Sequence, residues 1–137
     1  MKRLALVIVA GSSAACIDAG SGDRAGQTLP SDSHYVVVPN GYASPEECIA
    51  SAPQPFSCVL SLSLCRNGRA GARVGDIVED GTYTMDGSIA HIVFDRKTMD
   101  FDVAAVVELG SPNTTWIVDT EHRWETLQFD NISCQRP

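Results

Sequence analysis

The sequence predicts an all-β fold, a small antiparallel meander that closes as a barrel or folds as a two-layer sandwich. From residue 58 onward, short runs of alternating apolar and polar residues recur, with turn signals about every 8 to 12 residues. No helical pattern separates these runs, which favours antiparallel hairpins over a parallel sheet. Because consecutive strands then pair in order, a barrel or strongly curled sheet is the simpler topology. The chain of 137 residues has room for one such domain.

A short strand and one short helix are expected ahead of this region. Residues 35–39 read YVVVP, a β-branched run that Pro39 ends. In the next stretch, Ser44 fits the N-cap of a helix and Glu47 completes an S-x-x-E capping box. The prolines that follow limit this helix to about two turns. We expect it to cover one end of the sheet through Ile49.

The first hairpin of the β region is expected around Asn67 and Gly68. Residues 58–65 read CVLSLSLC, which predicts a half-buried strand with its leucines on one face and its serines on the other. Asn67-Gly68 predicts a tight turn in which both residues take positive φ. The glycines and alanines of residues 70–75 predict a weak, strongly bent or edge strand.

Further turns and strands are expected in the second half of the chain. Asp80-Gly81 and Asp86-Gly87 predict turns between short strands, the second leading into a strand at residues 88–94. Residues 99–109 carry the longest period-two run and predict one uninterrupted strand with a wet face. Its apolar face holds Met99, Phe101, Val103, Ala105, Val107 and Leu109. Strands at residues 114–119 and 124–129 complete the expected domain.

The amino terminus has the three parts of an export signal. Lys2 and Arg3 precede an apolar stretch at residues 4–10, and small residues follow at 11–15. These seven apolar residues are too few to span a hydrocarbon layer, which needs about 20. No later stretch is long enough either, so no membrane-spanning helix is expected.

The end of this signal carries a more specific pattern. Ser13-Ala14-Ala15-Cys16 resembles the lipobox of bacterial lipoproteins. The resemblance implies that Cys16 becomes the first mature residue, with a diacylglycerol thioether on its sulfur and an acyl chain such as palmitate on its amino group. At about 0.8 kcal/mol per buried methylene, several such chains give a lasting membrane anchor. Ser13 stands where that family usually has a bulky aliphatic residue, and Ser-Ala-Ala also fits ordinary secretory cleavage; the alternative is a soluble secreted protein without lipid.

Three regions follow from this interpretation. Residues 1–15 form a lipoprotein signal peptide, residues 16–34 the lipidated Cys16 and a flexible spacer, and residues 35–137 a single β domain. The spacer is rich in Gly, Ser and Asp and has almost nothing apolar to bury. The predicted location is the bacterial cell envelope. By the same resemblance, Ile17 after the cysteine is compatible with an outer membrane where the host has two membranes.

Lipidation of Cys16 leaves an even set of cysteines, Cys48, Cys58, Cys65 and Cys134, to form disulfides in an oxidising compartment. An extended strand between Cys58 and Cys65 separates their α carbons by about 23 Å, whereas a disulfide tolerates about 7 Å. That excludes one of the three pairings. Of the two that are left, we prefer Cys48–Cys58 with Cys65–Cys134, which closes a short proline-containing loop and fastens the C-terminal end to an early strand.

No catalytic residue, cofactor or metal is predicted. The sequence has no G-x-S-x-G, no H-E-x-x-H and no glycine-rich phosphate loop. Four acidic residues crowd neighbouring turns, and carboxylates in loops are the ligands that calcium takes. Hairpin turns use aspartates for their own geometry, which accounts for this group without a metal. These residues are Asp76, Glu79, Asp80 and Asp86.

Three residues are candidates for binding a ligand. His91 lies in the middle of a predicted strand, on the face of Ile89 and Val93, from which it could point into a cavity as a base or ligand. Trp116 and Trp124 could line the mouth of a barrel that takes a small apolar molecule. Burial in the core is the simpler explanation for both tryptophans.

The negative net charge of the chain limits the classes of partner that it is expected to bind. The formal net charge is −7, and without Lys2 and Arg3 it becomes −9, with 8 basic against 17 acidic residues. Such a surface repels phosphate backbones, so no nucleic-acid partner is expected. The sequence predicts a lipid-anchored envelope protein whose non-catalytic β domain binds a partner protein or a small apolar ligand. The alternative is an exported, hydrolase-like enzyme that uses His91 inside a barrel cavity.

Overall fold

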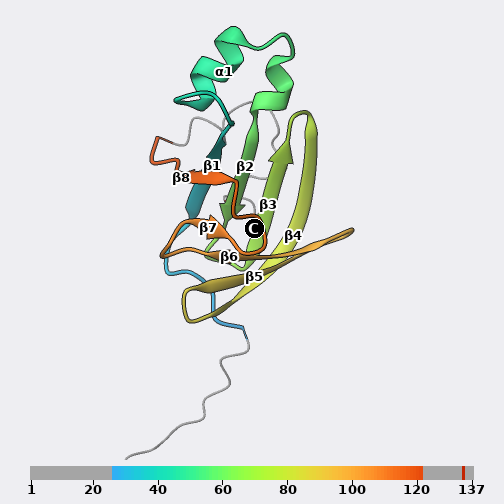
Figure 1. The fold of residues 1–137 in the computed structure, drawn as a ribbon. Helices are drawn as coiled ribbons and strands as arrows, with labels where there is room; N and C mark the ends of the chain where they lie inside the picture. Colours follow the sequence, from blue (N-terminus) through green and yellow to red (C-terminus); the bar gives the residue numbers. More distant parts are fainter. Residues whose placement is uncertain (1–25, 122–133, 135–137) are drawn as a thin grey trace, which may run out of the picture.

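The computed structural model describes residues 26–121 and Cys134 (Figure 1). One α-helix, one 3-10 helix and a sheet of eight strands make up this part of the chain. In chain order the elements are β1 (Ser33–Val38), α1 (Pro45–Ser51), η1 (Pro55–Cys58), β2 (Leu60–Leu64), β3 (Arg69–Val74), β4 (Ile77–Asp86), β5 (Ile89–Phe94), β6 (Thr98–Asp102), β7 (Val107–Glu108) and β8 (Thr115–Val118).

The strands form an antiparallel meander that curls into a nearly closed barrel. Their order is β7-β6-β5-β4-β3-β2-β1-β8, so only β8 leaves the chain order, by pairing with β1. The long β4 curves from one end of the barrel to the other, and β5 and β6 cross its base (Figure 1). This brings β7 close to β8 without a hydrogen-bonded ladder between them. The predicted all-β fold is confirmed, and the barrel rather than the sandwich is the form observed.

Helix α1 has the expected cap. The Ser44 Oγ accepts a hydrogen bond from the Glu47 amide at 3.1 Å, and the Glu47 carboxylate accepts one from the Ala43 amide at 2.7 Å. Side chains thereby satisfy two donors at the helix start. The helix lies at one end of the barrel (Figure 1), where Ile49 packs against Val36 and Val59.

Both disulfides follow the preferred pairing. Cys48–Cys58 joins α1 to η1 with 5.7 Å between α carbons, and Cys65–Cys134 has 5.2 Å. Strand β2 runs extended between Cys58 and Cys65, which is the geometry that excluded a bond between them. The short bridge therefore fixes the helical end, and the long one ties Cys134 to the end of β2.

Side chains fill the barrel interior. Phe101 is fully buried and lies between Tyr35 and Trp116, with ring centroids 4.7 Å and 5.3 Å away. The second contact is edge to face, at 82° between ring planes, which is a favoured aromatic geometry. The buried core comprises Tyr35, Val37, Leu62, Leu64, Ala70, Ala72, Tyr83, Met85, Ala90, Ile92, Phe94, Phe101 and Trp116.

Strand β3 is central, so of the weak, strongly bent or edge strand expected at residues 70–75, the edge strand is wrong. It pairs with β2 on one side and β4 on the other. Its inward residues Ala70 and Ala72 are opposite Leu64 and Leu62. Small barrels alternate small and large interior side chains to fit their width, and that is why these small residues occupy the middle of the sheet.

Gly81 does not form a turn, which corrects the expected break at Asp80-Gly81. Strand β4 passes through it without interruption. A Cβ at this position would collide with the Val93 carbonyl and with the Phe94 ring on β5. Gly81 is required because β4 and β5 approach each other closely at this position. Close approach of another backbone is one of the reasons for which glycine occurs inside a strand. The first hairpin also differs in detail: Gly68 takes a φ of 84°, but Asn67 does not take a positive φ.

The expected single strand at residues 99–109 is interrupted. Strand β6 ends at Asp102, whose carboxylate accepts hydrogen bonds from the Ala104 and Ala105 amides at 3.0 and 3.1 Å. These bonds hold the pKa of Asp102 below its usual range, and the bond from the Ala105 amide has the largest effect. Val106 then takes a φ of 56° and the chain returns as β7. The hydrogen bonds of the Asp102 side chain thus form a turn that interrupts the strand predicted from the period-two pattern.

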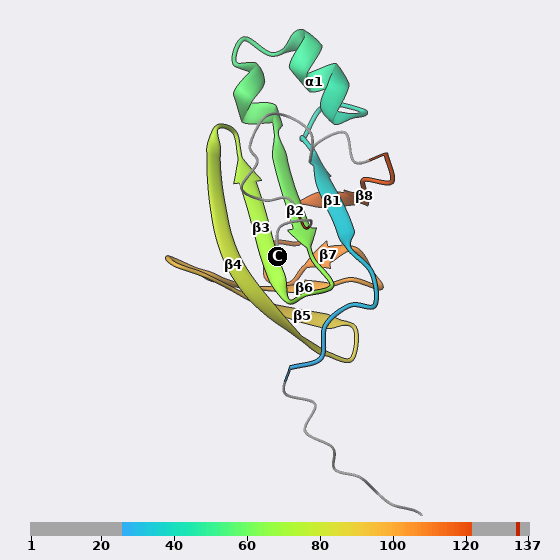
Figure 2. The same ribbon diagram turned by 180° about the vertical axis from the view of Figure 1, so that it is seen from behind.

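Residues 27–34, which the sequence assigns to the spacer before residue 35, contact the barrel or begin β1. The Tyr83 hydroxyl accepts from the Leu29 amide at 3.0 Å and donates to the Cys65 carbonyl at 2.8 Å. The Asp32 carboxylate accepts from the Arg66 amide at 2.8 Å. Burial raises the pKa of Tyr83, so its phenol keeps the proton that it donates. This part of the expected spacer lies against the barrel end opposite α1 (Figure 2). The expected strand at residues 124–129 lies outside the described residues.

The central position of Phe101 gives a first prediction. Phe101→Ala should lower the free energy of unfolding by about 3 to 5 kcal/mol, because it leaves a cavity between the rings of Tyr35 and Trp116. Val93→Ala is the control; Val93 is 54% exposed on the outer face of β5, and its loss should change little. Urea denaturation of both variants measures the difference. Equal losses of unfolding free energy in the two variants would contradict the central packing of Phe101.

The two disulfides should differ in how much each contributes to the free energy of unfolding. Removing Cys65–Cys134, with a sequence separation of 69, should lower the free energy of unfolding by about 4 kcal/mol in the chain-entropy account. Removing Cys48–Cys58, with a separation of 10, should lower it by about 3 kcal/mol. The paired Cys→Ala variants are compared by urea denaturation. The opposite order would show that the short bridge, not the long one, dominates.

Candidate functional site

The barrel interior leaves little space for a ligand among the described residues. Trp116 is 7% exposed and packs in the core against Phe101, so it does not line an open mouth. Its indole Nε1 has no hydrogen-bond partner within the described part of the chain. Trp124, the other tryptophan proposed for ligand binding, lies outside the described residues.

His91 lies on the outer face of the barrel and not in a cavity. It shares that face with Ile89 and Val93, as expected, but Ala90, Ile92 and Phe94 form the buried set. Burying that set places the Phe94 ring in the core and leaves the polar imidazole in water. The His91 side chain is 48% exposed, and its Nδ1 lies 2.7 Å from Asp100 on the adjacent strand. The hydrolase-like alternative therefore has no base inside the barrel at this position.

Two of the four acidic turn residues form ion pairs. Asp80 lies 3.4 Å from Arg69, and Glu79 lies 2.7 Å from Lys97. Within residues 26–121 and Cys134, no group of three or more His, Cys, Asp or Glu side chains could hold a metal ion. The other turn acids expected near them, Asp76 and Asp86, are exposed at the strand ends.

Buried polar groups on β1 and β3 have structural partners. The Nδ1 of His34 lies 2.8 Å from the Ser63 hydroxyl, and both side chains are buried. The Nε of Arg73 donates to the Gly75 carbonyl at 2.8 Å. These bonds hold neighbouring strands and turns in place and leave neither group directed at a cavity.

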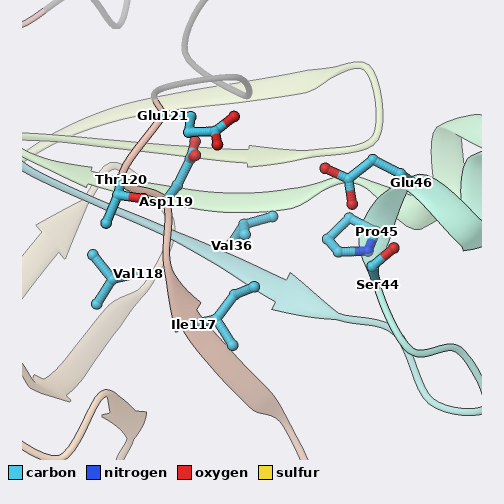
Figure 3. A pocket seen from close by; sticks show the side chains of 9 residues that line it. All are labelled: Val36, Ser44, Pro45, Glu46, Ile117, Val118, Asp119, Thr120 and Glu121. Atoms are coloured by element: carbon cyan, nitrogen blue, oxygen red, sulfur yellow. The ribbon is translucent and has the colours of Figure 1, made fainter.

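A recess lies on the outer face of β1 and β8 (Figure 3). Its volume is about 200 Å³. The start of α1 forms one side, and β8 with the residues after it forms the other. We call it the β8 recess; it is lined by Val36, Ser44, Pro45, Glu46, Ile117, Val118, Asp119, Thr120 and Glu121.

The β8 recess has an apolar floor. Val36 on β1 is 2% exposed and pairs with Ile117 on β8, so both side chains lie on the outer face of this strand pair. Ile117 and Val118 remain 41% and 49% exposed. The capping box of α1 holds the opposite side, because it fixes the backbone at Ser44 where the helix begins.

Carboxylates surround this floor. Glu46 and Glu121 are exposed at its edge, and Asp119 is buried beside them. The Asp119 amide donates to the His34 carbonyl at 2.8 Å, which fixes the chain where β8 ends. Among the described lining residues there is no lysine, arginine or histidine. The recess therefore combines apolar surface with negative charge.

A second hollow, of about 360 Å³, lies beside the start of β4 and the turn after β5. Its lining includes Glu79, Asp80 and Arg96. Two of these charges already form the ion pairs described above, and the lining carries both signs of charge. Asp95 is a further acidic residue of its lining.

The described residues thus define a small antiparallel barrel with a filled interior and an acidic, apolar-floored recess outside it. No family model, curated protein or solved structure matches this chain. Among the residues that the structure describes, no helix has the length and apolar character needed to cross a bilayer.

The residues of the β8 recess were not predicted from the sequence. They come from β1, the start of α1, and β8, which are far apart in the chain. One local signal was present in residues 114–119, where the adjacent apolar residues Ile117 and Val118 must face opposite sides of any strand. A strand with apolar residues on both faces is either buried on both or leaves one uncovered.

The position of His91 can be tested directly. His91→Ala should lower the free energy of unfolding by less than about 1 kcal/mol, because the pair with Asp100 is exposed. Ile92→Ala, at the next and fully buried position, is the matched contrast and should cost about 2 to 5 kcal/mol. Urea denaturation of both variants checks this. A large loss for His91→Ala alone would place the imidazole inside.

Proposed function

We propose that this chain is a lipid-anchored cell-envelope protein whose non-catalytic β domain binds a partner protein through the β8 recess. One observation carries the choice of a protein partner: thirteen buried side chains occupy the barrel interior. A ligand is then left with the outer surface. The volume of the β8 recess, about 200 Å³, is below the roughly 300 to 1,000 Å³ of ordinary small-molecule sites. It suits a side chain of a larger partner better than a free metabolite.

The anchored part of the proposal rests on residues 1–16. The charged start, the short apolar stretch and Ser13-Ala14-Ala15-Cys16 support export followed by lipidation of Cys16. The four remaining cysteines are all used in the two disulfides, which is consistent with an oxidising compartment.

The geometry of the barrel supports the same arrangement. The described chain begins at the barrel end opposite α1 (Figure 2). The β8 recess lies toward α1, since Ser44, Pro45 and Glu46 form one of its sides (Figure 3). The recess thus lies toward the end of the barrel opposite residue 26, and the proposed anchor would be attached from the residue 26 side (Figure 2).

Intact-mass analysis of the protein purified from membranes tests the anchor. We expect a chain that starts at Cys16, with the mass of the diacylglycerol and amide-linked acyl groups and no free thiol. Cys16→Ser should lose the acyl mass and the membrane association, while Ser12→Ala, a control in the same region, should keep both. A product that retains Met1, or that begins near Cys16 without acyl chains, would contradict the proposal and favour a secreted protein.

A further inference from the structure

We infer that Asn40 is a site of spontaneous deamidation, at which the folded chain converts this asparagine to aspartate and isoaspartate without an enzyme. The inference goes beyond the proposed function and does not depend on it. Two observations carry it. The turn at residues 39–42 leaves both reacting groups exposed and without hydrogen bonds, whereas the fold holds the other Asn-Gly pair of the chain, Asn67-Gly68, in place.

The reaction needs an asparagine side chain and the main-chain nitrogen of the next residue. This nitrogen loses its proton and attacks the side-chain carbonyl carbon. A carbon–nitrogen bond forms, ammonia leaves and a succinimide ring remains. Water then opens the ring at one of its two carbonyl groups, which gives aspartate or isoaspartate. Glycine in the next position favours the attack because it has no side chain to obstruct a close approach.

The turn that contains Asn40 leaves both groups available. Asn40 and Gly41 are exposed. Within the described part of the chain, neither the Asn40 side-chain amide nor the Gly41 main-chain nitrogen takes part in a hydrogen bond. One main-chain bond closes the turn, from the Tyr42 amide to the Pro39 carbonyl at 3.2 Å. Gly41 has a φ of 87°, and a Cβ built there would meet no atom within 4 Å, so no neighbouring group crowds the site.

Hydrogen bonds restrain the same groups in the second Asn-Gly pair. The Gly68 amide donates to the Cys65 carbonyl at 2.9 Å, so its nitrogen must break this bond before it can attack. The side-chain oxygen of Asn67 accepts a hydrogen bond from the Arg69 amide at 3.1 Å. The turn also joins the paired strands β2 and β3, and Cys65 is fixed by its disulfide. The folded hairpin therefore slows the reaction at Asn67.

Conversion at Asn40 changes the segment between β1 and α1. Each converted chain gains one carboxylate, in a protein whose formal net charge is already −7. Isoaspartate also adds one carbon atom to the main chain, shortly before Ser44, the N-cap of α1. The converted form thus differs from the original in its charge and in the connection that leads to the helical end of the barrel.

Ageing of the full-length protein tests the inference. The purified chain is incubated at mildly alkaline pH, which promotes loss of the amide proton, and is sampled over weeks. Peptide mapping by mass spectrometry measures the fraction converted at each Asn-Gly pair, and labelling by isoaspartyl methyltransferase measures isoaspartate. We expect the initial rate at Asn40 to exceed that at Asn67 by at least about fivefold, the factor that one main-chain hydrogen bond typically contributes.

Two controls separate the effect of the fold from that of the dipeptide. In urea with both disulfides reduced, the two pairs should convert at similar rates, because the hydrogen bonds that restrain Asn67 and Gly68 are lost. In the folded protein, Asn40→Gln should abolish conversion at this position, since glutamine has to close a larger ring. Asn67→Gln should leave the rate at Asn40 unchanged. Circular dichroism confirms that each variant is folded.

The rates in the folded protein decide the inference. Conversion that is equally fast or faster at Asn67 would overturn it. It would also be overturned if Asn40 converts in the unfolded chain but not in the folded one, because the turn at residues 39–42 would then protect the site. None of these outcomes bears on the membrane anchor or on the β8 recess.

Discussion

Packing of Phe101 between Tyr35 and Trp116 is the contact on which the barrel depends. Phe101 belongs to β6, near one end of the strand order, whereas Tyr35 and Trp116 belong to β1 and β8 at the other end. Strands β7 and β8 form no hydrogen-bonded ladder, so the sheet is closed by side-chain packing. Among the described strands, β8 therefore pairs with β1 alone.

The features that were predictable from the sequence are local or follow by elimination. The capping box of α1 depends on Ser44 and Glu47, which are three residues apart. An extended strand cannot bring Cys58 to Cys65, which excluded one of three disulfide pairings; the preferred one of the two left is observed. In each case the physical constraint acts within a short segment, where a single sequence carries the required information.

The features that were missed depend on neighbours distant in the chain. Gly81 looked like a turn because the obstruction at its Cβ comes from β5. The alternation in β5 correctly grouped His91 with Val93, but which face is buried was decided by the rest of the core. The Asp102 turn is the exception, since Asp102 bonds to residues close by; there two local preferences competed, and the period-two pattern favoured the wrong one. The β8 recess is formed by three segments that are distant in the chain, and no local sequence pattern indicates that they come together.

The attachment of the first described residues has a mechanical consequence. Four hydrogen bonds join residues 27–32 to the barrel: the Gln27 carbonyl to the Met85 amide, the Thr28 hydroxyl to the Arg66 carbonyl, the Leu29 amide to Tyr83, and Asp32 to the Arg66 amide. Tension applied through the preceding chain is thus shared among these bonds before it reaches β1. Because Tyr83 also bonds to Cys65, part of that tension passes to the disulfide-linked end of β2. Tension applied before residue 26 therefore strains the base of the barrel first. The helical end, which is distant from these bonds, carries less of it.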